Sequence, residues 1–390
     1  MLFQTTAPEA RYIAELIVSV GGAIVLFALV IWLISKNRSK PQNIVSSDRG
    51  LPSRFTMETK PKVFDGSSSS TRTTQESKRV FLADAFANWQ SQHLLKSDDG
   101  KSLFVRDGVE KHGLRYQLLA TTQTQALAVL LFSQLTAFEP GASHKAEALL
   151  ASLLAHPAYG ESNLSSWKYL PDLPSSPKLD ADLHAEAWAM LALLIARQQW
   201  QELDRFSYAD LIPERLSALF EAWQTHEESY PLPESRFLLD FLERNDPTHD
   251  WSSLKRKATD SATSLVGKDA RQLALSLLNL GLTALSSHDD YSVNLLKDNR
   301  QNIESFAFDE LSAEAERELS KSGRLACVVP ALMVQGDAPL LERAWQNLST
   351  QGVDKDDGFG ATMRVFALAL LSNQVWVIQH FANPTANAGY

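Results

Sequence analysis

The distribution of apolar and polar residues divides the chain into three parts. Residues 16–35 are twenty consecutive positions without a charge, followed by a polar stretch to residue 79 and then a long helical region. At about 1.5 Å per helical residue the uncharged run spans roughly 30 Å, which matches the hydrocarbon core of a bilayer. The run is too long for the apolar core of a signal peptide, and Lys36 follows it instead of a small-residue cleavage site. We therefore predict a retained, single-pass transmembrane helix.

Basic residues collect on one side of the predicted span. Residues 36–50 contain four Lys or Arg, whereas residues 1–15 contain only Arg11. The predicted membrane-interface residues are Trp32, Lys36, Arg38 and Lys40. The positive-inside rule predicts a bacterial inner-membrane protein whose short tail, residues 1–15, lies outside and whose C-terminal domain lies in the cytoplasm.

Residues 36–79 form a predicted linker. They contain ten Lys or Arg, four Asp or Glu, three prolines and a run of four serines. This composition cannot bury enough apolar surface to offset the entropy of ordering, so we expect a disordered basic tether next to the membrane. The whole chain carries a net charge of −9, so residues 80–390 are acidic. They lack the basic stripe that nucleic-acid binding requires, which excludes nucleic acid as a partner.

Residues 80–390 are predicted to form one all-helical domain. Apolar residues recur at helical spacing in an Ala- and Leu-rich sequence, and the alternation typical of strands is nearly absent. Pro, Gly and Asp breakers separate the expected helices, which cover residues 81–95, 123–138, 144–154, 183–199, 234–244, 270–285, 313–319, 339–348 and 360–371. A helical region of this length favours either a solenoid of paired helices or a closed ring of helical hairpins.

The sequence lacks the motifs that identify a cofactor, a metal or an activated nucleophile. It contains no glycine-rich phosphate loop, no zinc-binding pattern and a single cysteine, Cys327, within an apolar stretch. His184 and Glu186 lie on one predicted helix, where an exposed polar face explains them better than a ligand pair does. From these patterns we expect no cofactor and no metal site.

Several segments resemble, in the same order, glycoside hydrolase family 8, the bacterial endoglucanases that accompany cellulose synthases. The first, residues 121–128, is similar to the family's Thr-Thr-Ser-Glu-Gly-Gln-Ser-Tyr-Gly motif and opens an apolar helix. Similar segments follow at residues 166–169, 180–183, 196–200, 235–238, 251–254, 322–325 and 366–376. The resemblance covers most of residues 80–382 and implies an (α/α)6 barrel of six helical hairpins.

The chain departs from the family where catalysis requires a general acid. The family's Glu corresponds to Thr124, or to Gln123 if a gap is moved, and neither can deliver a proton to a glycosidic oxygen. The segment that supplies the family's catalytic base has no clear counterpart, and residues 270–273 are nearest to it in order. We therefore expect a pseudoenzyme without catalytic residues.

Five side chains are candidates for a saccharide- or partner-binding surface. Trp167 and Tyr169 precede a proline-rich loop, where exposed aromatic rings could stack on sugars at a rim. Asp180 and Asp182 match the family's Asp-x-Asp motif if the next helix has an extra turn, and otherwise the match falls on His184 and Glu186. The candidates are Trp167, Tyr169, Asp180, Asp182 and Glu186.

Other interpretations use the same residues. Residues 185–192 and 341–348 are similar to the first helix of a tetratricopeptide repeat, although the 34-residue period of that repeat is missing. The domain could then be an irregular tetratricopeptide-like solenoid that recruits proteins to the cytoplasmic face of the membrane. A third possibility is an active endo-glucanase with a relocated acid.

The sequence favours a membrane-anchored, non-catalytic accessory or scaffold protein of a bacterial envelope complex. The resemblance implies exopolysaccharide synthesis or secretion of the cellulose type. The expected partners are the membrane, other proteins of the complex and polysaccharide. A domain that handles secreted polymer would face the periplasm, which conflicts with the charge rule; we give precedence to the charge rule because it is a direct physical inference.

Overall fold

We analysed a computed structural model, which describes residues 69–375 except 99, 101, 113–114, 172–178, 201–209, 226–234, 262–268, 288, 313–318 and 353–354. All of these residues belong to the second of the chain's two units, residues 61–390. The predicted transmembrane segment, residues 16–35, and its interface residues lie outside the described part. Among the residues that are described, no helix is long and apolar enough to cross a bilayer.

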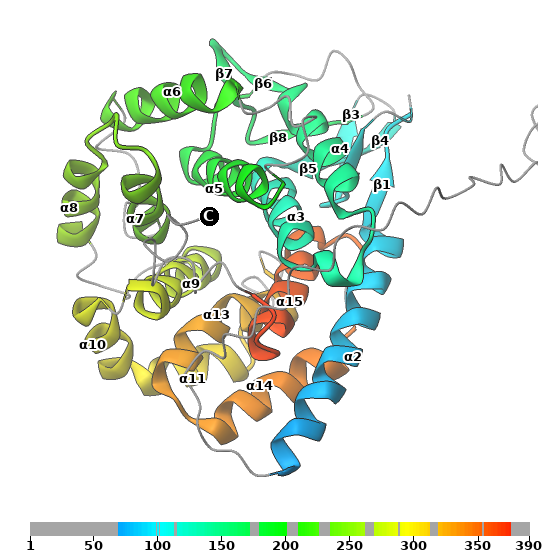
Figure 1. Ribbon diagram of the computed structural model, residues 1–390, viewed down its shortest axis with the longest axis vertical. Coiled ribbons are helices and arrows are strands. Elements are labelled where there is room, and N and C mark those ends of the chain that lie inside the picture. The colour runs from blue at the N-terminus through cyan, green and yellow to red at the C-terminus, as the bar shows by residue number, and fades with distance from the viewer. Residues whose placement is uncertain are drawn as a thin grey trace, which may run out of the picture. The chain divides into compact units, whose positions relative to one another are not determined.

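The described part of the chain is mainly helical (Figure 1). Helix α2 begins at Ser69, within the stretch expected to be a linker, so helical structure starts before Val80. The helices are α2 (Ser69–His93), α3 (Thr122–Gln134), α4 (Ala142–Leu154), α5 (Leu183–Gln199), α6 (Ile212–Thr225), α7 (Arg236–Asn245), α8 (Trp251–Ser261), α9 (Ala270–Ser287), α10 (Asp290–Asp298), α11 (Arg300–Phe308), α13 (Lys321–Gln335), α14 (Ala338–Thr350) and α15 (Gly358–Leu371).

Six of these helices form a closed ring, with others packed outside it (Figure 1). Along the described chain, α3, α5, α7, α9, α13 and α15 each pack against the next, and α15 returns to α3. Outside them, α4 packs on α3, α6 on α5, α8 on α7, α10 on α9, α11 on α13, α14 on α13 and α15, and α2 on α15. This is the (α/α)6 arrangement that the sequence predicted. The solenoid alternative is wrong, because the first and last inner helices are in contact.

Apolar patterning explains which helices are inner and which are outer. In α5 nearly every residue from Leu183 to Ala196 is buried, so its small and apolar residues cover all faces. In α14 only Leu340, Ala344, Trp345 and Leu348 are buried, which is the single stripe of an amphipathic surface helix. The inner helices therefore form the hydrophobic core, and the outer helices cover it.

The inner helices α9 and α13 approach closely at a glycine. A methyl group on Gly281, in the interior of α9, would lie 2.6 Å from the carbonyl carbon of Pro330 in α13. Carbon atoms at van der Waals contact are about 3.5–4.0 Å apart, so any larger residue at position 281 would push the two backbones apart. Gly281 thus sets the spacing on this side of the ring.

The described residues also contain short strands, contrary to the expectation that strands are absent. Four antiparallel pairs occur in the described residues: β1 (Leu94–Lys96) with β2 (Leu103–Val105), β3 (Val109–His112) with β4 (Arg115–Leu118), β5 (Ala120–Thr121) with β8 (Lys168–Tyr169), and β6 (Pro157–Ala158) with β7 (Glu161–Ser165). Each strand has two to five residues, which is too short for an alternating pattern to emerge.

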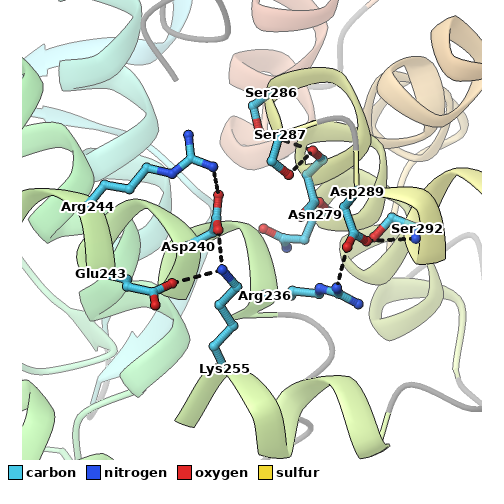
Figure 2. Close-up of polar contacts among 11 residues, drawn as sticks. Arg236, Asp240, Glu243, Arg244, Lys255, Asn279, Ser286, Ser287, Asp289 and Ser292 are labelled. Atoms are coloured by element: carbon cyan, nitrogen blue, oxygen red, sulfur yellow. Dashed lines mark hydrogen bonds and ion pairs between the residues drawn. The ribbon is translucent and has the colours of Figure 1, made fainter. Parts of the chain in front are cut away.

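Charged side chains join neighbouring helices on one side of the ring (Figure 2). Asp240 of α7 accepts from Arg244, at 2.7 Å, and from Lys255 of α8, at 2.5 Å. Arg236, at the start of α7, reaches Asp289 before α10 with an N–O distance of 2.8 Å. These contacts join the inner helix α7 to α8, the outer helix of its own hairpin, and to the start of α10, the outer helix of the next hairpin.

Candidate functional site

The inner helices begin on one face of the barrel, where Asp107 joins the first and last of them. Its Oδ2 accepts from the hydroxyls of Thr121 and Thr124 at the start of α3, at 2.6 and 2.8 Å. Its Oδ1 accepts from the backbone N–H of Phe359 at the start of α15, at 2.6 Å. Burial raises the pKa of the Asp107 carboxyl, while these three donors and the charge of Arg271 oppose the rise.

The remaining inner helices also start at this face. His184, in the first turn of α5, lies 3.1 Å through Nδ1 from the hydroxyl of Ser235, which immediately precedes α7. Arg271, in the first turn of α9, lies over the ring of Phe359 with 5.1 Å between guanidinium carbon and ring centroid. A methyl group on Gly323, at the start of α13, would lie 2.9 Å from the Cα of α15 residue Gly360.

Polar side chains cap the N-termini of these helices. Thr121, Asp182, Asp269, Ser320 and Asp357 each accept from a backbone N–H in the first turn of the helix that follows. Each N-terminus carries a partial positive charge of about half a unit, which the Asp caps partly neutralise. The face is therefore polar, and each of these caps is engaged by the helix that follows it.

Thr124 and Gln123, the two residues at the position expected for a general acid, differ in their hydrogen bonds. The Thr124 hydroxyl is held by Asp107 and Thr121. Gln123 is 6% exposed, and its amide nitrogen meets no hydrogen-bond partner among the described residues. Gln125 bonds both backbone groups of Val105. The first turn of α3 therefore carries amide and hydroxyl groups but no carboxyl group.

Glu186 is committed to a buried ion pair. Its Oε2 lies 2.8 Å from Arg215 Nη2 of α6, and its Oε1 accepts from the backbone N–H of Ser165 at 2.6 Å. Arg215 also donates to the Ser165 hydroxyl. The Glu186 side chain is 0% exposed, so the expectation that it lies on a binding surface is wrong. Its partner lies 29 residues away in sequence, which residue spacing alone does not reveal.

His184 is a structural residue rather than a base for Ser235. Trp188 donates its indole N–H to His184 Nε2 at 3.3 Å, so the proton of the neutral ring is assigned to Nδ1, which then donates to Ser235. Burial lowers the pKa of His184 to about 4, assisted by Arg271 and opposed by Asp182. Because the ring gives its proton to the serine instead of accepting one, this pair does not constitute a nucleophile and base.

The other predicted binding residues differ in their accessibility. Trp167 is 41% exposed, and its carbonyl accepts from the backbone N–H of Thr122, which places it beside the start of α3. Asp180 is exposed, and Asp182 caps α5. Tyr169 is 2% exposed and stacks on His156, so the prediction of an exposed rim position is wrong for it. Trp167, Asp180 and Asp182 remain near the face, whereas Tyr169 belongs to the interior.

Arg271 is the main residue of the face that sequence reasoning missed. The only available signal was its place in residues 270–273, nearest in order to the family segment that supplies the base. Nothing in the sequence indicates that α9 begins beside α15. In the described part of the chain, no group of three or more His, Cys, Asp or Glu could hold a metal ion.

Comparisons with solved structures agree with this architecture. A β-1,3-1,4-glucanase from Paenibacillus sp. X4 has a TM-score of 0.64 at 13% identity, with 77% of this chain and 93% of the glucanase covered. A cold-adapted family 8 xylanase has a TM-score of 0.56 at 13% identity, with 78% and 93% covered. A reducing end xylose-releasing exo-oligoxylanase gives the same four values.

The fold is that of the family 8 glycosidases. No family model matches the sequence, and no curated protein matches it. At 13% identity the likeness establishes the fold alone. Whether the chain also has the catalytic chemistry of family 8 depends on its individual residues. The first turn of α3, where the sequence resemblance places the family's acidic motif, contains Gln123 and Thr124 in this chain.

Proposed function

We propose that this protein is a non-hydrolytic, glycan-binding relative of the family 8 glycosidases, anchored in the bacterial inner membrane as an accessory or scaffold of an exopolysaccharide complex. The family 8 fold supports the link to saccharides. The uncharged run of residues 16–35 supports the anchor. The complex and its polymer, of cellulose type, follow from the resemblance in sequence order.

The observation that carries the loss of hydrolysis is the first turn of α3. Glycoside hydrolysis requires two carboxyl groups on either side of the scissile bond, one protonated and one ionised. Gln123 and Thr124 supply neither, and Glu186 is held by Arg215. Asp182 accepts two backbone N–H groups as the cap of α5, which fixes its carboxyl group at the helix end. The exposed ring of Trp167 beside α3 supports retention of saccharide binding.

An assay for reducing ends tests this proposal. The full-length chain, incubated with carboxymethylcellulose and with xylan, is expected to release none above a blank without protein. Burial raises the pKa of the Asp107 carboxyl group on this face, as a general acid requires. Activity that disappears in Asp107→Asn would overturn the proposal and favour an enzyme with a relocated acid.

The side of the membrane needs a separate experiment. Alkaline phosphatase fused after Tyr390 folds only in the periplasm, so we expect no activity from the fusion if the domain is cytoplasmic. A green fluorescent protein fusion at the same position is expected to fluoresce. The opposite result would reverse the orientation inferred from Lys36, Arg38 and Lys40.

A further inference from the structure

One charged group on the face has no hydrogen-bond or ion-pair partner among the described residues. The Arg271 guanidinium is half-buried and lies over the ring of Phe359. This cation–π contact orients the guanidinium plane but leaves its N–H groups without acceptors. Donors that are partly removed from water are costly unless an acceptor replaces the water, so Arg271 is poised for an acceptor from outside the chain.

The carboxylates around Arg271 each accept at least one other hydrogen bond, although Oδ2 of Asp357 is buried without a partner among the described residues. Asp107 accepts three hydrogen bonds, from Thr121, Thr124 and the Phe359 N–H. Asp182, Asp269 and Asp357 accept backbone N–H groups of the helices they cap. These four groups stabilise helix ends and the contact between α3 and α15. A ligand that brought its own carboxylate would therefore find the guanidinium free to bind it.

A second unpartnered donor lies on the same face. The Gln123 amide nitrogen is buried in the first turn of α3 and has no acceptor in the described part of the chain. Thr124, the next residue, bonds Asp107, whose carboxyl group is influenced by the charge of Arg271. The backbone of Trp167 lies beside this turn, and its exposed ring has the Lys168 ammonium 4.9 Å from its centroid. The face thus combines an exposed aromatic residue with two donor groups that have no acceptor among the described residues.

We propose that this face binds an acidic glycan, a saccharide chain that carries carboxylate groups, and that Arg271 pairs with one of these carboxylates. A carboxylate matches the planar fork of a guanidinium with two parallel hydrogen bonds, which a neutral sugar hydroxyl cannot do. Trp167, which is exposed, stacks on a neighbouring sugar. This inference rests on the proposed binding of saccharides, and it replaces the neutral, cellulose-type polymer of that proposal with a polymer that carries carboxylates.

Calorimetric titration of the full-length chain tests the inference. The protein is kept in a polyoxyethylene detergent, because detergents with sugar headgroups would compete. Oligogalacturonate of six units is compared with cellohexaose, which has the same length and no charge. We expect the acidic hexamer to bind about tenfold or more tightly, as charge-assisted hydrogen bonds imply. The preference should shrink when the salt is raised from about 20 mM to about 300 mM.

Two matched substitutions separate Arg271 from the general charge of the domain. Arg271→Gln is expected to remove the preference for the acidic hexamer over cellohexaose. Arg256→Gln, at an exposed position on α8, removes the same charge and is expected to change neither affinity. A loss of acidic binding in both variants would overturn the role of Arg271. Equal melting temperatures confirm that both variants are folded.

The remaining outcomes are distinct from one another. Equal affinity for both hexamers would overturn this inference and leave the proposed glycan binding intact. Binding of neither hexamer would overturn both. Inorganic phosphate at equal concentration is expected not to displace the acidic hexamer; displacement would identify a simple anion site and overturn the assignment of a glycan.

Discussion

Replacement of Arg215 by Met should reveal the cost of an unpaired carboxylate inside this fold. Glu186 is fully buried, with Oε2 2.8 Å from Arg215 Nη2 and Oε1 2.6 Å from the Ser165 N–H. Methionine retains much of the aliphatic bulk but donates no hydrogen bond, so one carboxylate oxygen loses its partner away from water. Breaking a buried pair costs about 3–5 kcal/mol. Because the Ser165 N–H remains, we expect the lower part of this range, about 3 kcal/mol.

Urea unfolding followed by tryptophan fluorescence measures this loss. The double variant Arg215→Met with Glu186→Leu is expected to recover much of the stability, because an apolar pair can replace a buried ion pair at little cost. Arg300→Met serves as the control, since Arg300 is about half exposed and pairs with Glu304 and Asp337 at the surface. It should cost far less than Arg215→Met, because solvent-exposed ion pairs contribute little to stability. A loss below about 1 kcal/mol for Arg215→Met, or strict additivity in the double variant, would refute the reasoning.

Three further predictions concern packing, pH and the contact between α3 and α15. Gly281→Ala should lower the free energy of unfolding by about 2 kcal/mol, because overpacking against α13 outweighs the roughly 1 kcal/mol that Ala gains in a helix; Gly352→Ala, which meets no atom within 4 Å, should be nearly neutral in the same denaturation assay. The folded protein keeps His184 neutral, with a pKa of about 4 against 6.5 in the unfolded chain. The contribution of His184 to the free energy of unfolding is therefore complete above pH 6.5 and is lost as the pH falls toward 4. In urea titrations the free energy of unfolding should fall from pH 7 to 4.5, and less steeply in His184→Gln; equal pH dependence in both proteins would contradict this prediction. Asp107→Ala leaves three donors without an acceptor and should cost about 2–3 kcal/mol by denaturation, whereas Asp107→Asn, which keeps an acceptor oxygen, should cost less.

Local signals predicted the helices well where caps and apolar spacing agree. The helix expected at residues 183–199 has these bounds in the structure, because Asp182 caps its first turn and Trp200 ends it. Helices α6, α8, α10, α11 and α13 have no counterpart among the helices expected from apolar spacing. Of these, α10 and α11 have nine residues each and bury only two or three of them. The short strands were missed as well. Each depends on hydrogen bonds to a paired strand and shows no alternation of apolar and polar residues that the sequence could reveal.

The site was less predictable, because it is assembled from helix ends far apart in sequence. Trp167 was found because an aromatic residue before a proline-rich loop is a local feature. Glu186 was misjudged, since its burial depends on Arg215 in the next helix. Arg271 was missed because only ring closure places the start of α9 beside Phe359. Tyr169 was misplaced for a similar reason, since its ring is covered by His156.

The closed ring constrains how the chain can be made. The indole N–H of Trp89 donates to the Thr362 hydroxyl at 3.1 Å across 273 residues of sequence, and α3 meets α15 over a similar separation. A ribosome that adds about 5–20 residues per second needs roughly 10–50 s to travel from the first inner helix to the last. During that interval the apolar edge of α3 has no final neighbour. We therefore expect the apolar edge of α3 to need shielding until α15 is made, and chains that terminate before α15 to be less resistant to proteolysis.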